Sequence, residues 1–99
     1  MKDEFISKIG VYGQMHYRYL RESKPSVLCA LRMKGTLRSY LEEVNQNAEE
    51  MLARLETEMT KSEGVTEALK RADQLGWVQK MNSIRNRAEE VVLNEIIYR

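Results

Sequence analysis

Apolar residues recur along this chain at the three- and four-residue spacing of α-helices, and the pattern predicts an all-α protein. A first helix is expected over residues 12–22, where Tyr12, Met15 and Tyr19 share one face. Pro25 should end this helix and begin a second one, because proline lacks an N–H but is tolerated in a first helical turn.

The second helix should stop near Gly35, and two long helices are expected after it, over residues 37–62 and 67–98. The first long helix carries a heptad stripe of Leu41, Val44, Ala48, Met51 and Leu55. The second carries one apolar stripe before Gly76 and another from Trp77 onwards, and the two stripes lie on different faces of the helix. A glycine inside a helix costs about 1 kcal/mol relative to alanine, so a bend, a close helix contact or a break is expected there.

A short connection around Gly64 should make the two long helices antiparallel neighbours. The expected fold is a long antiparallel helical hairpin of the two C-terminal helices, with two short N-terminal helices packed at one end. Residues 1–10 are expected to form an N-terminal tail and residues 11–99 a single helical domain. A hairpin has a narrow core, so the stripes favour a homodimer.

Composition narrows the class of protein. The chain has 99 residues, 42% of them hydrophobic and 31% charged, which is too apolar for a disordered segment. A single cysteine, Cys29, excludes a disulfide within the chain. The N-terminus lacks the apolar run of a signal peptide, and no stretch approaches the roughly 18 apolar residues of a membrane span. A cytoplasmic protein without membrane contact is therefore expected.

Charge is divided unevenly along the chain. Residues 1–40 carry eight Lys or Arg against three acids, a net charge of +5, whereas residues 41–99 carry eight against twelve, a net charge of −4. The candidate nucleic-acid-binding residues at the basic end are Arg18, Arg21, Lys24, Arg32, Lys34 and Arg38. Phosphate binding needs several cations on one side, because affinity grows with each neutralised phosphate. The alternative is an ordinary solvated surface.

The first long helix also carries a glutamate at every seventh position. The band comprises Glu42, Glu49, Glu56 and Glu63, with Glu43 and Glu50 beside the first two. Such a band can dock on a basic protein, but outward heptad positions are commonly charged for solvation alone, which is the interpretation we favour. Trp77 and Arg85 are residue types that anchor interfaces, although Trp77 fits core packing as well.

Nothing in the sequence points to catalysis, a metal or a cofactor. His16 and Cys29 are the only residues of their types, and their spacing indicates no catalytic pair with an orienting third group. The chain has no phosphate-binding loop, dinucleotide fingerprint, HExxH or CxxC motif. A non-enzymatic binding protein is therefore expected.

Two segments of the chain carry a family resemblance. Tyr12–Pro25 reads YGQMHYRYLRESKP and Gly76–Tyr98 reads GWVQKMNSIRNRAEEVVLNEIIY, with Gly35-Thr36-Leu37 between them. Together they resemble the TnpV-type proteins encoded within bacterial transposons and integrative elements. The second segment is the more specific, and the resemblance covers most of the chain from about residue 10 onwards. It implies a protein carried by a mobile element, for instance an excisionase-like accessory factor beside a recombinase, with no catalytic residues to carry over.

Three functions are consistent with these features. The first is a mobile-element accessory protein that binds DNA, a nucleoprotein complex or a recombinase through the basic helical pair. The second is an anti-CRISPR-type inhibitor that binds a host defence nuclease through the acidic band or the Trp77 region. The third is a helical oligomerisation scaffold whose specificity lies in its dimer surface.

Overall fold

The computed structural model describes residues 4–98, and the chain is 88% helical with no strand in that range. The predicted all-α class is therefore confirmed. The elements are the 3-10 helix η1 (Glu4–Lys8), the α-helices α1 (Val11–Ser23), α2 (Pro25–Lys34), α3 (Leu37–Ser62), α4 (Glu67–Ala72) and α5 (Gln74–Val92), and the π-helical turn η2 (Leu93–Ile97).

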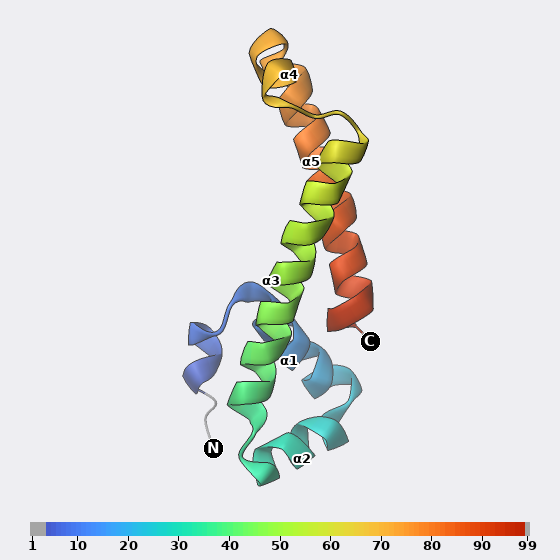
Figure 1. The fold of residues 1–99 in the computed structure, drawn as a ribbon. Helices are drawn as coiled ribbons and strands as arrows, with labels where there is room; N and C mark the ends of the chain where they lie inside the picture. The colour runs from blue at the N-terminus through green and yellow to red at the C-terminus, as the bar shows by residue number, and fades with distance from the viewer. Residues whose placement is uncertain (1–3, 99) are drawn as a thin grey trace.

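Helix α3 forms the spine of an elongated molecule (Figure 1). Helices α1 and α2 pack at the end where α3 begins, and α5 returns in the opposite direction along the remainder of α3. The molecule measures 55 × 22 × 18 Å, with a radius of gyration of 17.1 Å. A compact chain of this length would have a radius of gyration of about 13 Å, so the fold is a rod rather than a globule.

The core consists of two clusters along the spine. At the α1–α2 end, buried side chains from the residue after η1 through to α3 pack together, namely Ile9, Leu20, Leu28, Leu37 and Leu41. Nearer the middle, Ala48 of α3 packs with Val92 and Ile97 from the end of the chain. The crossing of α1 over α3 is close at Gly13, where an added Cβ would lie 3.1 Å from the Leu41 carbonyl oxygen.

The last part of the chain departs from the predicted single helix. The break falls at Asp73, three residues before the expected position, and α5 runs without interruption through Gly76. The Asp73 carboxylate accepts a hydrogen bond of 3.0 Å from the Gly76 N–H and so caps the start of α5. Thr66 caps α4 in the same way, by accepting a hydrogen bond of 3.2 Å from the Leu69 N–H.

The first described residues pack against the rest of the molecule. Residues 4–10 were expected within an N-terminal tail, but Glu4–Lys8 forms the helix η1, and Ile9 is only 5% exposed. Phe5 and Ile6 also contact the first core cluster. The division of the chain into a tail and a domain stays a prediction, and residues 1–3 lie outside the described range.

Candidate functional site

The basic residues predicted to bind nucleic acid gather at the α1–α2 end of the rod, and all six are exposed. Residues 11–36 carry five Lys or Arg against one acid, Glu22, a net charge of +4. Residues 37–98 carry eight Lys or Arg against twelve acids, a net charge of −4. The net positive charge therefore lies on the α1–α2 segment, whereas the net negative charge is spread over α3 to η2, along the whole length of the rod.

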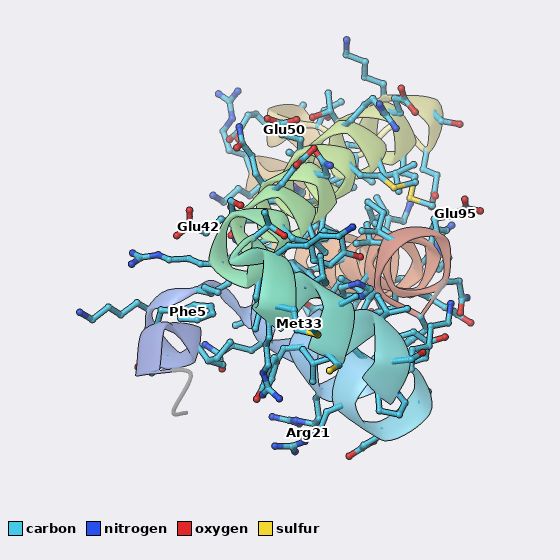
Figure 2. The ribbon with its side chains drawn as sticks, turned by 90° about the horizontal axis from the view of Figure 1, so that it is seen from below. Phe5, Arg21, Met33, Glu42, Glu50 and Glu95 are labelled. Atoms are coloured by element: carbon cyan, nitrogen blue, oxygen red, sulfur yellow. The ribbon has the colours of Figure 1, made fainter. Side chains whose placement is uncertain are left out.

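Tyr17 brings two of these cations together from different helices. The Arg21 guanidinium lies over the Tyr17 ring, 5.7 Å from its centroid, and Arg32 Nη2 donates a hydrogen bond of 3.0 Å to the Tyr17 hydroxyl. Viewed along the rod, Arg21 lies on the α1–α2 side of the molecule and Glu42 and Glu50 extend from α3 (Figure 2). The sequence reasoning missed Tyr17, because only the fold reveals which ring lies between α1 and α2.

Lys24 and Arg38 make contacts elsewhere. The Lys24 ammonium lies 5.8 Å from the centroid of the Tyr19 ring, and Tyr19 points about 200° away from Tyr17 around α1. Arg38 Nε forms an ion pair of 2.8 Å with Glu42, one turn along α3, which offsets its charge. The structure therefore groups Arg21 with Arg32, but it places neither Lys24 nor Arg38 at the same ring.

His16 joins three elements at the centre of this end. It is 5% exposed, and its Nδ1 lies 2.7 Å from the Ile97 carbonyl oxygen of η2. Because a carbonyl can only accept, Nδ1 donates this hydrogen bond, and Nε2 forms a second hydrogen bond of 2.7 Å with the Tyr40 hydroxyl of α3. Burial raises the pKa of Tyr40, and the Glu43 charge raises it further, so this phenol keeps its proton.

A half-open groove of about 360 Å³ lies beside His16, hereafter the aromatic groove. Its polar and aromatic lining comes from His16, Tyr19, Lys24, Tyr40 and Asn47, with aliphatic side chains completing the walls. The His16 ring centroid lies 6.1 Å from that of Tyr19 and 5.5 Å from that of Tyr40. Among the described lining residues there is no carboxylate.

A second surface runs along α3 and α5. One groove of about 550 Å³ lies between α1, α3 and α5, and a neighbouring hollow of about 240 Å³ is lined by Trp77 and Met81. Arg85 lines both, and its Nε lies 3.7 Å from a carboxylate oxygen of Glu56 and of Glu89. Of the predicted protein-partner residues, the structure gathers Glu49, Glu56, Trp77 and Arg85 here, whereas Glu42, Glu43 and Glu50 do not line these hollows.

The described residues contain no group of three or more His, Cys, Asp or Glu that could hold a metal ion. Within the same residues, no helix has the length and apolar character needed to cross a membrane.

A family model described as "Transposon-encoded protein TnpV" matches residues 1–97, which is nearly the whole chain. No curated protein and no solved structure matches this chain.

Proposed function

The chain belongs to the TnpV family of transposon-encoded proteins, and we propose that it is a cytoplasmic, non-enzymatic accessory protein that binds nucleic acid through its α1–α2 end. The observation that carries this proposal is the net charge of +4 on residues 11–36, which lies at one end of a rod whose remaining described residues carry −4. A concentration of positive charge on one segment favours phosphate binding there rather than along the acidic remainder of the chain.

The expected salt dependence follows from the number of cations. Binding to duplex DNA weakens with a log–log slope of about −0.9 for each phosphate neutralised. The five cations of α1, α2 and the junction between them would therefore give a slope of about −4.5 if every one of them contacts a phosphate. The geometry at Tyr17 supports a contact of this kind, because Arg21 and Arg32 converge there from two helices.

The test is a double charge reversal, Arg18→Glu with Arg21→Glu, measured by fluorescence anisotropy with duplex DNA across a salt series. Binding should fall sharply and the slope should shrink by about 1.8, because two phosphate contacts are lost. The matched control reverses two exposed cations towards the other end of α3, Arg54→Glu with Lys61→Glu, and should bind nearly as well as the wild type. Equal loss in both variants, or unchanged affinity in the first with helical circular dichroism intact, would contradict the proposal.

We also propose that α3 and α5 form the surface of a homodimer. The chain exposes 6928 Å², whereas a compact monomer of this mass exposes about 5,800 Å². The excess, about 1,100 Å², is comparable with the roughly 800 Å² that each partner buries in a stable interface. Met81→Glu should convert the dimer to a monomer in sedimentation equilibrium, whereas Met33→Glu, on the 83% exposed side chain of α2, should not.

A second candidate function is inhibition of a basic protein such as a defence nuclease. The carboxylates of Glu56 and Glu89 both pair with the guanidinium of Arg85, and Glu49 lines the apolar groove beside it. Glu56 Oε1 is buried and accepts no hydrogen bond from the described residues. This excess of acceptors suits a partner with cations on an apolar helix face.

That candidate is tested by nuclear magnetic resonance titration with an amphipathic lysine–leucine helical peptide. Binding should weaken in the variant with Glu49→Gln, Glu56→Gln and Glu89→Gln. The control variant, with Glu43→Gln and Glu50→Gln, should bind normally, because those two side chains lie outside the groove. An equal effect of both sets would indicate only a nonspecific charge effect.

A further inference from the structure

We propose that the aromatic groove beside His16 captures one unpaired nucleobase of a nucleic acid strand that lies on the basic α1–α2 end. This inference rests on the proposed nucleic-acid binding and names the part of the ligand that the groove would recognise. Bases stack on aromatic side chains whatever their sequence, because every base has a π-face.

The groove has the size and wall chemistry for a planar ring. Its volume of about 360 Å³ lies at the lower end of the range found for small-ligand sites, about 300–1,000 Å³. Flat aromatic surfaces come from Tyr19 of α1 and Tyr40 of α3, with the His16 ring within 6.1 Å of both centroids. A base in this groove would contact aromatic and aliphatic side chains, and its outer edge would remain in water because the groove is half open.

The aromatic walls are held in place before any ligand binds. His16 is fixed through both ring nitrogens, by the Ile97 carbonyl and by the Tyr40 hydroxyl, each at 2.7 Å. The Tyr19 ring meets the Tyr98 ring edge to face, with centroids 5.5 Å apart. Side chains that are ordered in the free protein lose little conformational entropy on binding, so the groove is preorganised for stacking.

The polar groups fit a nucleotide rather than an uncharged aromatic ligand. Lys24 lines the groove at the junction of α1 and α2, where its ammonium can neutralise the phosphate attached to the captured base. The Asn47 side-chain amide offers both a donor and an acceptor to a base edge. Carboxylates, which would repel a phosphate, are not found among the described lining residues.

A stacked base within a duplex cannot reach a side-chain groove, so the ligand is a single strand, a frayed end or an extruded base. The inference therefore separates two kinds of binding. The exposed arginines should serve duplex and single strand alike, whereas the aromatic groove should add affinity for the single strand only.

The experiment uses the full chain and a single-stranded decamer that carries one 2-aminopurine, compared with the same decamer carrying an abasic site at that position. Stacking should quench 2-aminopurine fluorescence, and the abasic strand should bind more weakly than the strand with the base. Tyr19→Ala should lower single-strand affinity roughly 5- to 150-fold, the range for removal of one base–aromatic stack, and should abolish the quenching. Tyr19→Phe keeps the ring and should keep both affinity and quenching.

The outcomes distinguish this inference from the proposed function. If duplex and single strands both bind with steep salt dependence, but quenching is absent and Tyr19→Ala binds the decamer normally, the groove is not a base site and the basic end still binds nucleic acid. If the wild type binds neither strand type at low salt, both proposals fail together. Loss of duplex binding in Tyr19→Ala with helical circular dichroism intact would also overturn the separate role given to the groove.

Discussion

Replacement of His16 should destabilise the fold far more than replacement of an exposed side chain. His16→Ala removes two hydrogen bonds of 2.7 Å and leaves the Ile97 carbonyl without its donor and the Tyr40 hydroxyl without its imidazole partner. A lost hydrogen bond costs about 1 kcal/mol, and a buried polar group left unpaired costs about 1–3 kcal/mol. The expected loss of unfolding free energy is therefore about 3 kcal/mol. For a domain of this length, that lowers Tm by roughly 12–24 °C.

The two partners of His16 provide the control. Tyr40→Phe removes only the hydroxyl and should cost about 1 kcal/mol, whereas His16→Asn keeps a donor near Ile97 and should cost less than His16→Ala. Urea unfolding followed by circular dichroism gives the free energies of the single and double variants. Because the two side chains share one hydrogen bond, the double variant should be about 1 kcal/mol less destabilised than the sum of the singles. Additivity, or a loss below about 1 kcal/mol in His16→Ala, would refute the reasoning.

Three further predictions concern pH and helix ends. Burial raises the pKa of both Tyr12 and Tyr40, so the folded chain holds protons that unfolded tyrosines release near their ordinary value of 10.0. The contribution of these two tyrosines to the free energy of unfolding is therefore full below that pH and is lost as the pH rises above it. In melting curves at alkaline pH, the variant with both tyrosines replaced by Phe should lose less stability than the wild type. Asp73→Ala should cost about 1 kcal/mol in urea unfolding, because it removes the cap of α5, whereas Asp73→Asn should cost less. Glu63→Gln should leave Tm nearly unchanged, because the Glu63–Arg87 ion pair is exposed and screened by water.

Helix ends were predictable where the chain itself marks them. The second helix begins at Pro25 and ends before Gly35, whose φ of 71° is the left-handed conformation that glycine adopts at low cost. The third helix spans Leu37–Ser62, as expected from its stripe and from Gly64, whose φ is 68°. These boundaries depend on local backbone chemistry, which a sequence carries in full.

The break at Asp73 was missed because two local signals compete there. The phase change of the apolar stripe points to Gly76, whereas the capping signal is the carboxylate three residues earlier. An aspartate side chain that bonds a nearby N–H can end one helix and start another. The capping aspartate, and not the apolar stripe, therefore marks where α4 ends and α5 begins.

The contacts of the candidate site depend on the tertiary fold. Tyr17 contacts both Arg21 and Arg32 only because α2 folds back against α1. His16 bonds a backbone carbonyl that lies 81 residues away in the chain, and any residue type can supply a carbonyl. No spacing rule reveals such a pair, so the sequence could nominate cations but not the groove beside them.

The two segments that carry the family resemblance, Tyr12–Pro25 and Gly76–Tyr98, meet at the bond between His16 and Ile97. The first segment supplies Tyr19 and Lys24 to the aromatic groove, and the second supplies Ile96 to its wall. The groove therefore exists only when the end of the chain is docked on α1 and α3. Stability and binding should thus depend on the same contact, because a change that releases η2 removes both a core cluster and a wall of the site. This coupling explains how a short rod with a divided core holds its aromatic side chains in place. The hydrogen bonds of His16 fix η2 and α3 against α1, and the same contacts form the wall of the groove.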